Sequence, residues 1–121
     1  MNFQIFLRKA VPFHFEIEER SLFPMLERAA GFEKTLILDL VAEHKIIIKM
    51  ISEFLAIVKS GIENEDRKRE LVKIGGWIIE KLSAHAQRED AELLPLAHKV
   101  LDQEKLEELE KIVKNMIKTS Q

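Results

Sequence analysis

Cysteine is absent from the 121 residues of this sequence, and proline and glycine are scarce, at three and four residues. Without cysteine the protein has no disulfide, no thiolate nucleophile and no cysteine-ligated zinc or iron–sulfur cluster. A metal ion bound here would therefore need histidine nitrogens and carboxylate oxygens as its ligands.

Long apolar runs and charge of one sign are also missing. No stretch approaches the roughly 18 apolar residues of a membrane span, and the opening residues lack the apolar core and the small-residue cleavage site of a signal peptide. Acidic and basic residues are interspersed, and the formal net charge is −2. We therefore expect a cytoplasmic protein that binds neither nucleic acid nor a membrane.

A chain of this length should form one domain, residues 1–121, around a single core. Apolar residues recur at steps of three and four instead of alternating, which predicts an all-α fold. Gly31 and Gly61 would end the first two helices, and Pro12 would kink or divide the first. Short connections favour antiparallel neighbours in an up-and-down bundle. The expected helices run from about Phe3 to Arg28, from about Glu33 to Ser60, from about Glu65 to a bend or end at Pro95, and onwards from Asp102.

Two segments share a pattern: HFEIEERSLFP at 14–24 and HAQREDAELLP at 85–95. Each has a histidine and a glutamate four residues later. An acidic residue follows that glutamate directly, and a proline stands six positions after the glutamate. Residues four apart lie on one face of a helix. His14 with Glu18, and His85 with Glu89, can therefore each present a nitrogen and an oxygen to one metal ion or to two adjacent ions.

A third histidine, His44, occupies a position of the apolar stripe on the second expected helix, where an aliphatic residue would be typical. Three helices would thus point imidazoles inward, and two of them would add carboxylates. Burying such groups unpaired costs several kcal/mol, and a divalent or trivalent cation removes that cost. The predicted metal ligands are His14, Glu18, His44, His85 and Glu89.

Residues next to these ligands have simpler interpretations. One histidine with a glutamate four residues on is more often a surface ion pair, and it is the repetition, with the third histidine, that favours a shared site. Glu19 and Asp90 are turned off the ligand face, so we interpret them as solvated acids or as hydrogen-bonding partners of the ligands. For Glu43, simple exposure is favoured over such a partner role. His98 is interpreted as a surface histidine, and it is the alternative candidate if a further metal ligand is needed.

The ordered combination of these motifs resembles the hemerythrin-like HHE cation-binding domain over nearly the whole chain. The resemblance implies a bundle of hemerythrin type that holds a non-haem di-iron centre, with Glu18 and Glu89 bridging the irons and His14, His44 and His85 as the other ligands. Zinc or another divalent metal suits the same ligands. The matching residues are His14, Glu18, Glu19 and Leu22-Phe23-Pro24, then Glu43-His44, then His85, Glu89, Asp90 and Leu93-Leu94-Pro95.

The chain departs from this family at its N-terminus. Members usually carry an earlier helix with one more histidine, and only 13 residues precede His14. Three explanations are open: a misassigned start of a longer protein, a ligand or cover from a second subunit, or an incomplete site that holds one metal or binds weakly. We favour a homodimer, because the helices would expose an apolar flank and Gly75-Gly76 would permit close helix approach.

A second departure is Ile48, which stands where oxygen carriers of the family have another histidine, four residues after His44. With fewer imidazoles, the resemblance favours iron binding, or sensing of O2, peroxide, nitric oxide or redox state, over reversible O2 transport. An enzyme acting on peroxide or nitric oxide, or an iron-centre repair factor, ranks lower, because no general acid or nucleophile is readable in the sequence. A metal-free helical interaction module is the third alternative.

Overall fold

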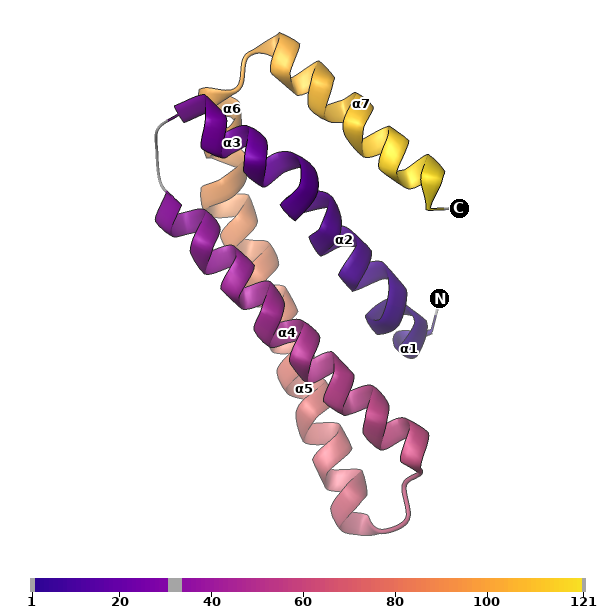
Figure 1. Cartoon of the computed structure of the whole chain (residues 1–121). Helices are drawn as coiled ribbons and strands as arrows, with labels where there is room; N and C mark the ends of the chain where they lie inside the picture. The colour runs from indigo at the N-terminus through magenta and orange to yellow at the C-terminus, as the bar shows by residue number, and fades with distance from the viewer. Residues whose placement is uncertain (1, 31–33, 121) are drawn as a thin grey trace.

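The computed structural model describes residues 2–30 and 34–120, and every regular element in those ranges is helical. The elements form four helical segments, and Figure 1 shows the last of them running beside the first. The first segment comprises α1 (Phe3–Ile5), η1 (Phe6–Ala10), α2 (Val11–Ile17), η2 (Glu18–Leu22) and α3 (Phe23–Ala30). The second is α4 (Lys34–Ser60), the third comprises α5 (Glu65–Arg88), η3 (Glu89–Leu93) and α6 (Leu94–Val100), and the fourth is α7 (Gln103–Thr119). This confirms the all-α, up-and-down bundle.

The first and third segments continue through their prolines, because one wide π turn precedes each of them. The turns η1, η2 and η3 end two residues before Pro12, Pro24 and Pro95. In each turn, the residue before the proline donates its backbone N–H to the carbonyl five residues back. Proline has no N–H and clashes with the carbonyl four residues before it, and a wider turn gives that carbonyl room. Pro12 therefore neither ends nor divides the first helical segment.

Helices α4 and α5 form a long antiparallel pair. Gly61 follows α4 with a φ of +93°, the left-handed conformation that favours glycine. Asn64 then caps α5, its side chain accepting a hydrogen bond of 2.9 Å from the backbone N–H of Arg67. Gly75 lies against Phe54 of α4, where a Cβ atom would be 3.1 Å from the ring. The missing side chain at Gly75 thus allows the two helices to approach closely.

Two apolar clusters fill the bundle, and a polar layer lies between them along each of the first three segments. Because apolar side chains pack on both sides of this layer, water has little access to it. The first cluster consists of Phe23, Met25, Leu26, Leu36, Ile37, Leu40, Leu93, Ala97 and Leu101. The second consists of Leu7, Val11, Phe15, Ile47, Ile51, Phe54 and Ile78. The buried polar residues of the described chain are Glu18, Ser21, His44, His85 and Glu89.

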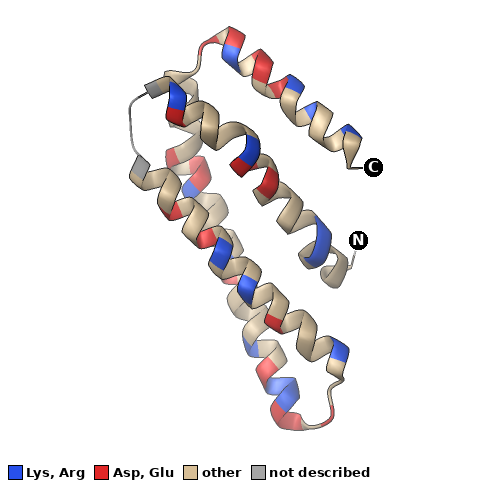
Figure 2. Ribbon diagram, viewed as in Figure 1, with Lys and Arg blue, Asp and Glu red and all other residues tan. Residues whose placement is uncertain are grey.

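Helix α7 packs on the outside of the bundle. As predicted, Asp102 caps it, accepting a hydrogen bond of 2.9 Å from the backbone N–H of Lys105. Leu106, Leu109 and Ile112 pack against the first apolar cluster, yet no residue of α7 itself is fully buried. Both signs of charge occur on α7 and on the other three segments, as Figure 2 shows.

The predicted boundaries at Ser60 and Glu65 agree with the structure. Two others differ: the first helical segment continues past Arg28 to Ala30, and the third does not end at Pro95 but continues to Val100. The predicted boundaries at Gly31 and Glu33 lie outside the described residues. Within 2–30 and 34–120, no helix is long and apolar enough to cross a membrane.

Two leucines on α4 test the importance of the first apolar cluster. Leu40 has no exposed surface, and Leu38 is 66% exposed. We expect Leu40→Ala to lower the free energy of unfolding by about 2–5 kcal/mol, because it leaves a cavity. Leu38→Ala, the matched control, should change it by less than about 0.5 kcal/mol. Urea unfolding followed by circular dichroism measures both, and equal losses would contradict the assignment of Leu40 to the core.

Candidate metal centre

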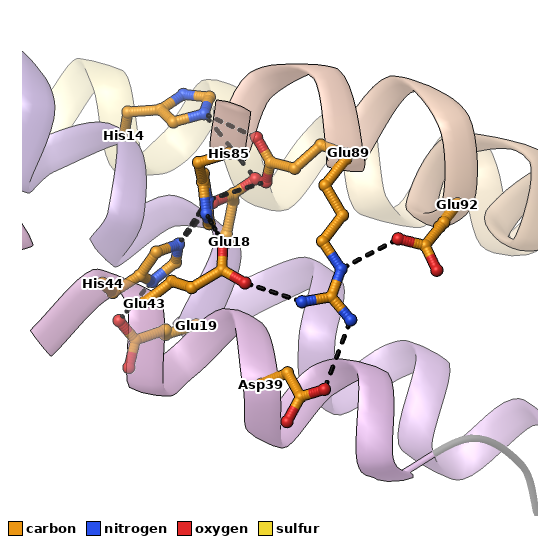
Figure 3. A network of polar contacts seen from close by, with 10 residues as sticks. His14, Glu18, Glu19, Asp39, Glu43, His44, His85, Glu89 and Glu92 are labelled. Atoms are coloured by element: carbon orange, nitrogen blue, oxygen red, sulfur yellow. Dashed lines mark hydrogen bonds and ion pairs between the residues drawn. The ribbon is translucent and has the colours of Figure 1, made fainter. Parts of the chain in front are cut away.

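Four buried side chains converge in the polar layer. Glu18 comes from η2, His44 from α4, His85 from α5 and Glu89 from η3, and one ligand atom of each lies within 4.8 Å of the others. Figure 3 shows these carboxylates and imidazoles turned towards one another. Three separate helical segments thus supply donor atoms to one small, buried volume.

The two buried imidazoles face each other through their Nε2 atoms, which are 3.1 Å apart. On the far side of each ring, Nδ1 contacts a carboxylate: Glu19 at 2.9 Å from His44, and Glu43 at 2.8 Å from His85. An ionised carboxylate can only accept hydrogen bonds, so each Nδ1 donates its proton. In the neutral rings, both Nε2 atoms then direct lone pairs at the cluster.

In each carboxylate of the layer, one buried oxygen has no hydrogen-bond donor near it among the described residues. Oε1 of Glu18 lies 3.0 Å from Nε2 of His44, and Oε2 of Glu89 lies 3.6 Å from Nε2 of His85. Neither oxygen accepts a hydrogen bond from any residue that the structure describes. One proton on an Nε2 atom would remove the repulsion between one pair of acceptor atoms. A bound cation would attract both Nε2 lone pairs and both carboxylates at once.

The spacing of the two nitrogens also suits a metal ion. Two nitrogens held about 2.1 Å from one ion, at an angle of about 90–110°, are roughly 3.0–3.4 Å apart. The Nε2 atoms of His44 and His85 fall within this range, at 3.1 Å. The residues present therefore fit a metal ion in donor chemistry and in spacing.

His14 lies at the rim of this cluster. Its side chain is 61% exposed, so the expectation that all three imidazoles point into the core is wrong for this residue. Its Nε2 atom still faces the carboxylates, at 3.6 Å from Oε2 of Glu18 and 3.8 Å from Oε1 of Glu89. The exposure arises because this side of α2 borders an open cavity of about 420 Å³.

Each buried carboxylate spans the cluster from one end to the other. Glu18 turns Oε1 towards His44 and Oε2 towards His14. Glu89 turns Oε2 towards His85 and Oε1 towards His14. The inner end therefore has two imidazoles and two carboxylate oxygens, and the outer end has one imidazole and the other two oxygens. This arrangement could hold two adjacent cations, of which the outer one would have an open side.

The prolines of the repeated motif account for the placement of the two glutamates. Glu18 and Glu89 are each the first residue of a π turn, and their carbonyls accept the N–H of the residue before Pro24 and Pro95. A π turn adds a residue to the helical turn and so redirects the side chains around it. A proline six positions after the glutamate thus places the wide turn at a glutamate of the buried cluster.

Aromatic rings hold the His44 imidazole in place. Phe15 stacks on it with ring centroids 3.8 Å apart and an angle of 7° between the planes, and Phe23 stacks at 5.8 Å. Phe15 also meets His85 edge-on, at 5.4 Å. Together with the carboxylate at each Nδ1, these contacts fix the ring orientations before any ligand binds.

Glu43 has a role that the sequence analysis did not favour. Simple exposure was expected, but the side chain is half-buried and contacts both Nδ1 of His85 and the guanidinium of Arg88. Glu43 precedes His44 in the chain and serves the imidazole of the neighbouring helix. That pairing depends on how α4 and α5 are rotated against each other, for which the sequence carries no direct signal. Arg88 was missed for the same reason.

The other neighbouring residues match their interpretations. Glu19, which is partly exposed, acts as a hydrogen-bonding partner through its contact with His44. Asp90 and His98 are exposed and do not belong to the buried cluster.

The proline of the second motif can be tested against the proline of η1. Pro95→Ala restores a backbone donor and removes the steric reason for the wide turn, so the turn can close and shift Glu89. We expect the affinity for a divalent metal to fall about tenfold, while the metal-free protein is at least as stable, since alanine is the better helix former. Competition with a chromophoric chelator measures the affinity. Pro12→Ala is the control, because its turn begins at Phe6, outside the cluster. Unchanged affinity in Pro95→Ala would contradict the role of the proline.

Comparison with known proteins agrees with the site. Comparisons with curated proteins and with solved structures gave no match. The family model of the hemerythrin HHE cation binding domain matches residues 2–97, a range that includes both copies of the motif and His44. The chain therefore belongs to the hemerythrin HHE cation-binding domain family.

Proposed function

We propose that this domain binds a non-haem di-iron centre through His14, Glu18, His44, His85 and Glu89, and that it serves iron binding or the sensing of O2, peroxide, nitric oxide or redox state. The observation that carries this proposal is the opposite orientation of the two oxygens in each buried carboxylate. A carboxylate used in this way offsets positive charge at two positions at once. Imidazole and carboxylate donors without thiolates suit iron, and they also suit zinc or another divalent metal.

The unequal ends of the cluster favour binding of a small molecule at the outer position. His14 provides the imidazole there, and the open cavity beside it is lined mainly by apolar side chains. An apolar lining admits a small, uncharged molecule more readily than an ion. Iron, when bound, supplies the coordination position and the redox chemistry. The chain's own contribution is to orient the ligands and, through Phe15 and the two apolar clusters, to keep water from the inner end.

We also propose that a second copy of the chain covers this open side in a homodimer. Phe6 and Ala10 line one wall of the cavity and Leu82 and Ala86 the other. The apolar surface continues along α5, since Ile79 and Val72 recur at the same helical spacing and are 57% and 70% exposed. A continuous apolar strip of this kind is typical of an interface.

Metal content is the first test of the proposed function. We expect about two irons per chain in protein loaded with ferrous iron, with both lost in His85→Ala and Glu89→Ala, because each change opens the inner end. His14→Ala should retain about one, and His98→Ala, as control, about two. Elemental analysis of desalted protein measures the content. A wild-type protein that takes up no iron would contradict the proposal.

Unchanged thermal stability after chelation would support the metal-free alternative, since a metal bound to the native state stabilises it.

Solution mass tests the proposed dimer. We expect a particle of twice the chain mass of 14.1 kDa in sedimentation at micromolar concentration. Ala86→Glu should give monomers, because it places a charge in the apolar interface. Leu38→Glu is the control, since Leu38 is an exposed apolar residue on α4 that does not line the cavity. A monomeric wild-type protein would contradict the dimer and would leave the metal site itself untouched.

A further inference from the structure

Each buried imidazole contacts a carboxylate, and only one of these two carboxylates is itself held by an arginine. Glu19, which contacts His44, has a side chain that is 40% exposed, and within the described residues its ion pair is with that histidine. Glu43, which contacts His85, is also bound by Arg88, whose Nη1 lies 2.7 Å from its second oxygen. One imidazole is therefore held by a carboxylate that is itself anchored, and the other is not.

Arg88 is fixed by three carboxylates from two helical segments. Besides Glu43, its Nη2 atom lies 3.2 Å from Asp39 of α4, and its Nε atom lies 2.8 Å from Glu92 of η3. Figure 3 shows the three acids, Asp39, Glu43 and Glu92, which supply these carboxylates. The hydrogen bond to Glu92, with those to Glu43 and Asp39, raises the pKa of Arg88 above its already high ordinary value, so it stays charged. A planar guanidinium with several donors can hold all three acids in one geometry, which a lysine cannot do.

Glu43 has room to move if this anchor is removed. A cavity of about 370 Å³ lies beside Glu43, His85 and Arg88, and its other lining residues include Trp77 and Lys81. A carboxylate released from the guanidinium could turn into this space and be solvated there. Without Arg88, the contact with Nδ1 of His85 would be left to hold Glu43 against this solvated alternative.

We propose that Arg88 is a positioning residue for His85 and acts through Glu43. By fixing Glu43, it keeps the proton of His85 on Nδ1 and leaves the Nε2 lone pair directed at the buried cluster. Among the described residues, no arginine or lysine pairs with Glu19 in this way, and the His44 ring is held by the stacking of Phe15 as well. The effect of Arg88 on metal affinity rests on the proposed function, whereas its effect on the His85 ring does not.

The tautomer of His85 in the metal-free protein tests this inference directly. Long-range nitrogen–proton NMR of labelled histidines, at about pH 8 where imidazoles are ordinarily neutral, distinguishes a proton on Nδ1 from one on Nε2. We expect the Nδ1 form for His85 in the wild type, a mixture of both forms in Arg88→Gln, and partial recovery in Arg88→Lys. His44 should keep its proton on Nδ1 in all variants, although its Nε2 signal should shift wherever His85 carries a proton on Nε2, because the two Nε2 atoms are 3.1 Å apart. Arg20→Gln is the control, because within residues 2–30 and 34–120 Arg20 pairs with an exposed acid one turn away on its own segment, Glu16, and with no acid of the site.

A double-mutant cycle separates a positioning role from general stabilisation. In zinc competition, Arg88→Gln and Glu43→Ala should each lower the affinity about 10–100-fold. The double variant should be no weaker than Glu43→Ala alone, because Arg88 acts through Glu43. An Arg88→Gln protein that unfolds more easily but keeps the His85 signals and the zinc affinity of the wild type would overturn the inference. A changed tautomer in a protein that binds no metal would instead overturn the proposed function and leave the positioning role standing.

Discussion

The structure depends on one electrostatic constraint: two carboxylates and two imidazoles are buried together, and one oxygen of each carboxylate has no hydrogen-bond donor among the described residues. Glu18, His44, His85 and Glu89 are each less than about a tenth exposed. Their facing lone pairs and unpartnered oxygens oppose folding. Apolar packing on both sides keeps the inner end of the layer buried, and a cation there would be attracted to the lone pairs and oxygens that otherwise repel one another. Folding and cation binding are therefore expected to be linked.

The prolines show how the backbone meets this constraint. In a regular α-helix a proline is destabilising, but here each one follows a π turn that lets the helix continue. In two of the three cases the turn begins at a buried glutamate, Glu18 or Glu89. The third begins at Phe6, at the edge of the open cavity. All three π turns thus lie in the first and third segments, and the two that begin at the polar layer begin at a glutamate of the buried cluster.

The two ends of the polar layer differ in the support that they receive. The inner end has stacked and hydrogen-bonded imidazoles, so its donor atoms are held before binding. The outer end has His14, which is exposed and has no ring stacked closely on it among the described residues; Phe15 is tilted and its centroid is 6.3 Å away. A rigid inner end beside an adaptable outer end suits a site that retains a metal ion while admitting a small molecule.

Much of this protein could be predicted from its sequence alone. Helical periodicity gave the all-α bundle, and the spacing of histidine and glutamate placed both motif pairs on single helical faces, because such relations are local to one helix. The exposure of His14, the partnership of Glu43 with His85 and the anchoring by Arg88 could not be predicted in this way. They depend on how far the helices are rotated about their axes and how closely they approach. Packing between helices decides both, as at Gly75 against Phe54, and that packing joins residues far apart in the chain.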